Sequence, residues 1–325
     1  MRRYDIHERH PFFEYVRMED DSVPPSDPHA VDVALLDMNH SWPNIGHDAL
    51  VHIVLEAAAD VSEELARSGR HVRLLSFDVR RRHHLPDPAD GRYRLYLGTG
   101  GPGHLDPRMN DGEHEWSQGV AESAEWEAPL FRLFDHILED QNVALLAVCH
   151  SFGLVCRWAG VARPVLRETK SSGMPLNRLS REATDHPWFS QFARELPDHE
   201  HFRVIDNRLF DLILEDARTS LPIAFEAGGN SAMTMIELAR DASGSMPRFI
   251  GANHHPEIID REHIMQVLDE KHDHGEVSDQ WYEERRQTMR ELFEGENERQ
   301  SRLTSRYTLL EPLRFHLERV LRGRE

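Results

Sequence analysis

The stretch "NVALLAVCHSFGLVCRWAG" (residues 142–160) combines the features that decide the fold. Its small and β-branched residues at 143–148 predict a buried strand, and the apolar spacing after the strand predicts a helix. Cys149 stands between the two, at a helix N-terminus where the helix dipole and free N–H groups favour a thiolate. Such a cysteine is either an ordinary buried thiol or a nucleophile at a sharp turn. Cys156, within the helix among apolar neighbours, is expected to be a core thiol.

Strands and helices alternate on both sides of this stretch. The apolar runs predict early strands at 31–38, 71–79 and 93–103, with helices at 48–69 and 128–141. This alternation predicts an α/β fold with a parallel sheet. Later segments predict a short helix at 231–241 and further strands, some of them antiparallel, at 202–214, 222–229 and 248–255. The Pro-rich residues 1–30 are expected to form an irregular arm, and the charged residues after about 260 have a helical period.

Composition limits the possible partners. The chain has 325 residues and a formal net charge of −19, which disfavours nucleic acid and anionic membranes as main partners. Its two cysteines are too few for a disulfide framework. The N-terminal residues lack the apolar segment of a signal peptide, and no stretch is apolar enough to cross a bilayer. A cytoplasmic protein is therefore expected.

Two further motifs also follow expected strands. "GTGGPG" (98–103) is rich in glycine, so its backbone N–H groups can point into a site and stabilise an oxyanion. "GANHHPEI" (251–258) separates His255 from Glu257 by one proline, which restricts the backbone between an imidazole and a carboxylate. A carboxylate in that position can orient the imidazole as a base for a thiol.

The glycine turn, the cysteine and the His-Pro-Glu segment occur in an order that resembles the class I glutamine amidotransferases, in particular stand-alone domains similar to those of GMP synthases. That family has a G-G-P-G turn, a G-x-C-x-G elbow and a final F-H-P-E. The segments "KSSG" (170–173) and 186–212 are also similar to its middle section. The resemblance implies a flavodoxin-like, doubly wound, mostly parallel sheet with helices on both faces, and no cofactor.

The resemblance also implies roles for particular residues. Cys149 is then the nucleophile, His255 the base that later protonates the leaving ammonia, and Glu257 the group that orients His255. The backbone N–H groups of Gly101 and His150 form the oxyanion hole. The implied reaction is hydrolysis of a side-chain amide, in glutamine or another γ-glutamyl compound.

Several positions depart from the family pattern. Ser151 replaces the glycine two residues after the nucleophile, and Gly153 replaces the glutamine that helps to hold substrate glutamine. Asp206-Asn207-Arg208 stands where many relatives have H-G-D beside the glutamine pocket. His254 stands where an aromatic residue is common, and either tunes His255 or fills the same volume. These changes leave glutamine itself open as the substrate.

The family resemblance covers residues 31–268, which are expected to form the amidotransferase-like domain. Residues 1–30 would be an N-terminal arm, and 269–325 a helical C-terminal extension. The extension is too short for an ATP-using synthetase and has no nucleotide motif, so any ammonia acceptor is expected to be a separate synthetase. The extension either forms a homodimer through its helices or packs on its own domain.

Two other interpretations stay open at this point. The altered elbow is also compatible with a non-catalytic regulatory or binding module on the same fold. A metal site is the other alternative, built from His254, His255, Glu257, His263 and the pair His272 and His274. None of these spacings matches a zinc helix motif such as H-E-x-x-H, so no metal is expected.

Overall fold

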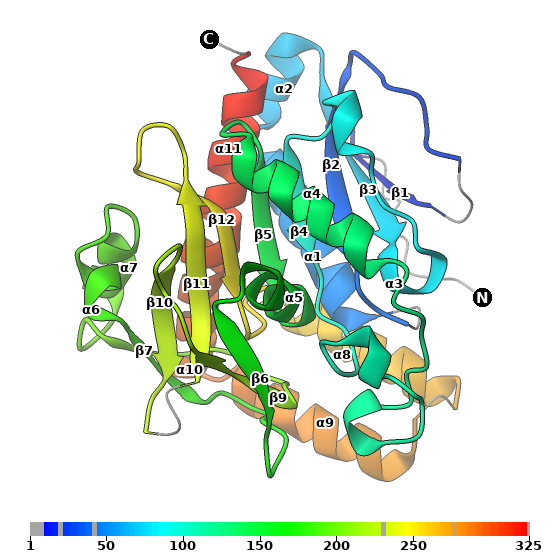
Figure 1. Ribbon diagram of the computed structural model, residues 1–325, viewed down its shortest axis with the longest axis vertical. Helices are drawn as coiled ribbons and strands as arrows, with labels where there is room; N and C mark the ends of the chain where they lie inside the picture. The colour runs from blue at the N-terminus through cyan, green and yellow to red at the C-terminus, as the bar shows by residue number, and fades with distance from the viewer. Residues whose placement is uncertain (1–9, 19–21, 41–43, 229–231, 276, 324–325) are drawn as a thin grey trace.

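The computed structural model describes residues 10–18, 22–40, 44–228, 232–275 and 277–323. Ten strands form one sheet in the order β1-β3-β2-β4-β5-β12-β11-β10-β7-β8, and β6 and β9 form a separate antiparallel pair (Figure 1). The strands are β1 Phe13–Arg17, β2 Ala30–Asp37, β3 His71–Asp78, β4 Leu95–Gly98, β5 Ala144–Val148, β6 Ala162–Leu166, β7 Leu176–Leu179, β8 His201–Arg203, β9 Phe210–Leu214, β10 Leu221–Glu226, β11 Met233–Arg240 and β12 Pro247–Ala252.

The strands from β1 to β12 in this spatial order are parallel, and the remaining pairs are antiparallel. Helices cover both faces of the sheet (Figure 1). The expected flavodoxin-like α/β fold, mostly parallel and extended by C-terminal helices, is confirmed. The helices are α1 Ile45–Asp60, α2 Ser62–Ser68, α3 Val79–Arg82, α4 Glu127–Glu139, α5 His150–Ala159, α6 Arg181–Thr184, α7 Phe189–Glu195, α8 Arg261–Asp273, α9 Asp279–Leu292, α10 Glu296–Ser305 and α11 Glu311–Leu321, with a π-helical turn η4 at Arg306–Leu310.

Alternating side chains of the central strands supply both halves of the core. In β5, Leu146 and Val148 point into a cluster with α1 and α11, whereas Leu145 and Ala147 point into a cluster with α4 and α5. This alternation is the normal period of a strand buried on both faces. The strand is therefore held from both sides up to its last residue, which precedes Cys149.

Two sequence expectations need correction. Residues 231–241 were expected to form a helix, but β11 pairs antiparallel with both β10 and β12. The first five residues of β11 are buried, and a place inside the sheet overrides the weak helical preference of this segment. Residues 13–17, expected within an irregular arm, form the edge strand β1 beside β3.

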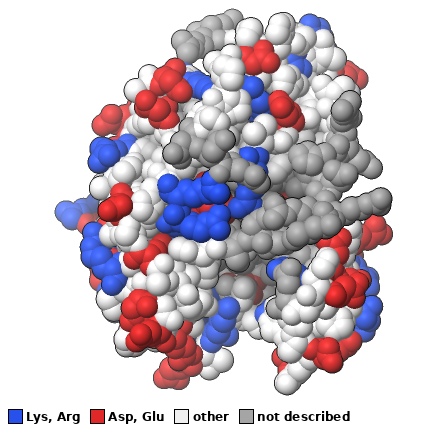
Figure 2. All heavy atoms as spheres, turned by 90° about the vertical axis from the view of Figure 1, so that its right-hand side faces the viewer, with Lys and Arg blue, Asp and Glu red and all other residues white. Residues whose placement is uncertain are grey.

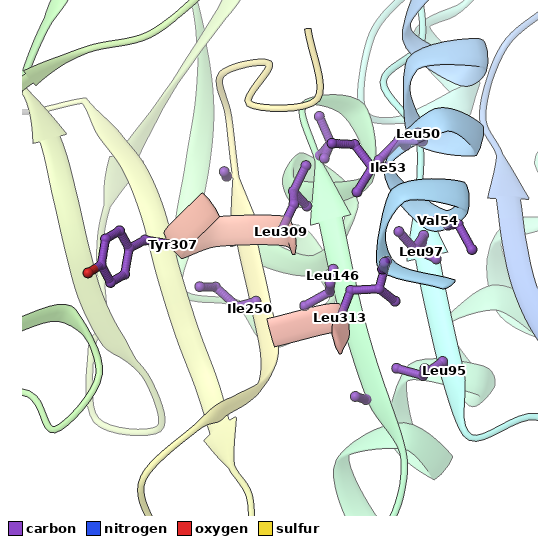
Figure 3. Packing of buried hydrophobic residues seen from close by; sticks show 14 of the residues in the cluster. Leu50, Ile53, Val54, Leu95, Leu97, Leu146, Ile250, Tyr307, Leu309 and Leu313 are labelled. Atoms are coloured by element: carbon purple, nitrogen blue, oxygen red, sulfur yellow. The ribbon is translucent and has the colours of Figure 1, made fainter. Parts of the chain in front are cut away.

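Part of the C-terminal extension packs against the main sheet. Tyr307, Leu309, Leu313 and Leu317 are buried in the same cluster as the central strands. Figure 3 shows Leu309 and Leu313 lying between the sheet and helix α1. Residues 306–321 therefore belong to the main core. Among the described residues, no helix combines the length and apolar character needed to cross a membrane.

The order of the strands places three distant sequence motifs side by side. Strands β4, β5 and β12 are neighbours, with Gly98 opposite Ala147 and Ala252 opposite Val148. The loops that follow these strands therefore leave the sheet at the same level. In α/β sheets this edge, at the carboxyl ends of the parallel strands, is where ligands bind.

Candidate active site

Cys149 occupies a strained turn between β5 and α5. Its φ of 49° and ψ of −102° lie in a region that residues other than glycine rarely adopt. The turn is held because the N–H of Cys149 donates to the carbonyl of Ala252 (2.7 Å) and its carbonyl accepts from the N–H of Gly153 (2.9 Å). The thiol is only partly buried, whereas Cys156 is fully buried and burial raises the pKa of its thiol.

Ser151, which departs from the family pattern, fits because Gly98 has no side chain. A Cβ atom on Gly98 would lie 2.5 Å from the Ser151 hydroxyl. That hydroxyl donates to the carbonyl of Thr99 (2.6 Å), and the Ser151 N–H also points to this oxygen (3.3 Å). The serine therefore ties the first turn of α5 to the end of β4.

The glycine turn is pressed against the cysteine and the histidine. A Cβ on Gly100 would lie 3.0 Å from His255 Cε1 and 3.8 Å from Cys149 Sγ, and one on Gly101 would lie 2.3 Å from the Met38 carbonyl. Within the described residues, the N–H groups of Gly101 and His150 donate no hydrogen bond. Both N–H groups are therefore free to donate to a ligand beside Cys149.

His255 and Glu257 form a buried pair next to the cysteine. The Nδ1 atom of His255 lies 2.7 Å from Glu257 Oε1, and the His255 N–H donates to the carbonyl of Ile205 (2.7 Å). Burial by itself lowers the pKa of His255, but the charges of Glu257 and Cys149 and hydrogen bonds to both raise it well above 6.5. The imidazole is thus held protonated by the two groups on either side of it.

The neighbouring His254 fills space in the core. Its ring is fully buried, has no hydrogen-bond partner on either nitrogen among the described residues, and packs edge-on against Phe202. Burial, together with repulsion from Arg208 and His255, lowers its pKa to about 3. Of the two readings left open above, the structure supports the one in which His254 fills an aromatic volume. Across the described residues, no group of three His, Cys, Asp or Glu side chains is arranged to hold a metal ion.

The positions that depart from the family pattern have a structural explanation. A Cβ on Gly153 would lie 2.5 Å from a methyl carbon of Leu105, so the leucine occupies the space in front of this position. A cavity of only about 40 Å³ remains between Leu105, Phe210 and the cysteine. Arg208 points inward and is buried.

Arg208 is neutralised by three carboxylates. It donates to Asp206 (2.6 Å), to Asp211 (3.2 Å) and to Glu226. Asp206 also accepts a hydrogen bond from the Ser171 hydroxyl (2.6 Å). The carboxylate that the family pattern has at position 208 is therefore replaced by a cation that is already paired.

A buried ion pair that the sequence did not suggest supports the glycine turn. Arg80 donates to the carbonyls of Met38 (2.9 Å) and Pro102 (2.7 Å) and pairs with Glu122 (2.6 Å). Glu122 belongs to the acidic loop 110–127, and Gln118 of the same loop accepts from the N–H of Gly103 (2.9 Å). The loop is thus anchored to the turn. Arg80 and Glu122 are 42 residues apart in the sequence, so no local pattern predicts this pair.

Comparisons with known proteins come from solved structures. No protein-family model and no curated protein matches the chain. A glutamine amidotransferase from Thermotoga maritima is 12% identical with a TM-score of 0.49, over 90% of this chain and 99% of that chain. A glutamine amidotransferase from Methylobacillus flagellatus is 12% identical with a TM-score of 0.45, over 74% and 75% respectively. Both are named for the family that the sequence resembles; likenesses this low carry no argument about activity.

Proposed function

We propose that this chain is a glutamine amidotransferase-like thiol hydrolase that cleaves a side-chain amide through Cys149, His255 and Glu257. The observation that carries the proposal is the position of the cysteine. It lies at a strained helix N-terminus, beside an imidazole that a buried carboxylate contacts at 2.7 Å. A core cysteine needs neither the strain nor the charged pair.

The proposed reaction has two steps. The Cys149 sulfur attacks the amide carbon, and the N–H groups of Gly101 and His150 stabilise the oxyanion. The C–N bond then breaks as His255 protonates the leaving nitrogen, and Glu257 keeps the imidazole oriented and charged. Water, activated by His255, hydrolyses the thioester and restores the thiol.

The proposal leaves open which acyl group is cleaved and which enzyme accepts the ammonia. Gly153, Leu105 and Arg208 alter the pocket expected for glutamine, so another γ-glutamyl compound is an equally good candidate. If ammonia is the product, a separate synthetase would accept it. A cytoplasmic location and a homodimer through the C-terminal helices stay predictions, the second testable by the mass in solution.

Release of ammonia from glutamine, or of amine from γ-glutamyl amides, tests the proposal. Turnover should fall by about 10⁴-fold or more in C149A, because the nucleophile is lost, while the melting temperature stays close to that of the wild type. C156A should retain turnover and serves as the matched control. Full turnover in C149A would overturn the mechanism.

The competing function is a non-catalytic module on the same fold. It predicts no turnover and a Cys149 that reacts with iodoacetamide no faster than free cysteine at pH 7. The proposed hydrolase instead requires faster labelling, because His255 next to the thiol is protonated. The labelling rate therefore separates the two functions even before a substrate is found.

A further inference from the structure

A large cavity opens from Cys149 and His255 and adjoins the small pocket, with which it shares Gly101, Gln118 and Asn207. It has a volume of about 490 Å³ and is bounded by the glycine turn, residues 170–173 and 205–207, and helix α9. Helix α9 supplies one face to it, formed by Trp281, Arg285, Thr288, Met289 and Leu292. These positions have the spacing of a single helical face. Helices α8 and α9, which lie along the lower edge of Figure 1, therefore form one wall of the site.

The charges that line this cavity are mostly positive. Lys170, Lys271 and Arg285 line it, and Asp206 is the only carboxylate among the described lining residues. Asp206 already accepts from Arg208 and Ser171. A surplus of cations at one site is unusual in a chain whose net charge is −19. Figure 2 shows one face of the molecule, on which acidic and basic side chains are mixed and a group of basic side chains gathers near the centre.

Lys170 and Arg285 have no carboxylate partner among the described residues. The Arg285 guanidinium lies 5.4 Å from the ring centre of Trp281, which steadies it at the cavity. Lys170 is exposed as a whole residue, but partial burial of its ammonium group lowers its pKa. The charge of Arg285 also lowers this pKa, whereas Cys149 acts in the opposite direction. Two unpaired cations that repel each other next to a nucleophile form a binding site for an anion.

The two cavities also differ in which part of the substrate they could hold. His255 lines the large cavity, whereas His150 and Leu105 line the small one. The leaving nitrogen takes its proton from the imidazole, so the amine portion must lie on the side of His255. The small pocket of about 40 Å³ is too small for an amine that carries a carboxylate, whereas the large cavity of about 490 Å³ has room for it.

We infer that the substrate is an amide whose amine portion carries a carboxylate, and that Lys170 and Arg285 bind this carboxylate beside helix α9. The inference rests on the proposed thiol hydrolase. The acyl group is transferred to Cys149 sulfur, the C–N bond breaks, and the anionic amine leaves with a proton from His255. Water then releases the acyl group as a carboxylic acid, and no other reactant is needed.

Iodoacetate and iodoacetamide provide probes of nearly equal size that differ in charge. Both alkylate Cys149 with loss of iodide, and the rate of each is compared with its rate for free cysteine. In the wild type, iodoacetate should be favoured over iodoacetamide by about tenfold relative to free cysteine, and added salt should weaken the preference. Labelling of C149S measures any background at Cys156.

His255 also carries a positive charge that attracts an anion. Variants of Lys170 and Arg285 separate the effect of these two cations on the labelling rate from the effect of His255. R285Q and K170Q should each lower the iodoacetate rate about three- to tenfold and change the iodoacetamide rate less than twofold. R290Q removes the same charge from an exposed position of α9 that does not line the cavity, and should change neither rate. Thermal melts confirm that each variant is folded.

The results separate failure of this inference from failure of the proposed function. An iodoacetate preference that survives in both R285Q and K170Q, or is absent in the wild type, overturns the anion site. Slow labelling by iodoacetamide, at the rate of free cysteine, contradicts the thiol hydrolase whatever the charge preference is. Loss of the preference in R290Q as well would assign it to overall charge and overturn the site.

Discussion

The elbow around Cys149 and the helix α9 that faces it meet at one cavity but are built differently. The elbow follows a strand whose side chains are buried on both faces of the sheet. Helix α9 packs through a smaller cluster that includes Ile205, Ile258 and Met289, and most of its surface is charged. The proposed nucleophile thus follows a strand that is buried on both faces. Arg285, which we propose reads the substrate, lies on a helix that we expect to open at lower free energy.

Among the variants that keep Cys149, the largest effect is expected from E257Q. The variant removes the charge that holds the pKa of His255 well above 6.5, so this pKa should fall. Turnover should drop by about 10³-fold, and the alkaline limb of its pH profile, where His255 loses its proton, should move to lower pH. E262Q, on the exposed first turn of α8, is the control that should leave both unchanged. An unmoved alkaline limb in E257Q would contradict the assigned pair.

Two identical truncations compare the anchoring of the two regions. L146A removes a fully buried side chain of β5 and should lower the free energy of unfolding by about 3–4 kcal/mol. L292A, in the smaller cluster under α9, should lower it by about 2 kcal/mol and should speed hydrogen exchange mainly in α8 and α9. Denaturant unfolding and amide exchange measure both. Exchange that rises uniformly over the sheet in L292A would contradict the difference in anchoring.

The smallest effect concerns acid stability near the elbow. His254 has a pKa of about 3 in the folded chain, below the ordinary value of 6.5 in the unfolded chain. As pH falls from 6.5 toward 3, the unfolded chain binds more protons, so this residue costs up to about 1.4 kcal/mol of stability per pH unit. His316, whose pKa is lowered to about 4 chiefly by burial, acts in the same direction.

H254F should therefore lose less stability than the wild type between pH 6.5 and pH 4.5. It should also be somewhat more stable at pH 7, because two buried nitrogens without partners are removed. Urea unfolding at pH 7, 5.5 and 4.5 gives both quantities, and the pH 7 value serves as the internal reference. The same slope with pH in both proteins would show that His254 is hydrated or paired in solution.

Local patterns were sufficient for the central parallel strands of the fold. The runs that became β2, β3 and β5 are apolar and short, and the helices between them have clear spacing, so their types follow from the chain itself. The prediction of a helix at 231–241 is wrong because the helical preference of this segment is weak and its partners β10 and β12 are known only once the sheet is formed. Strand β1 is not predicted by the local pattern because its residues are only partly buried.

The sequence alone determined the order of the three site motifs and the residue types that make thiol chemistry reasonable. Tertiary structure decided what surrounds them: the Arg80–Glu122 brace, the leucine in front of Gly153 and the approach of Arg285 to Lys170. Local structure depends on neighbours in the chain, which a sequence displays directly. These surroundings join residues 42, 48 and 115 positions apart, and only the packing of the whole chain brings such residues together.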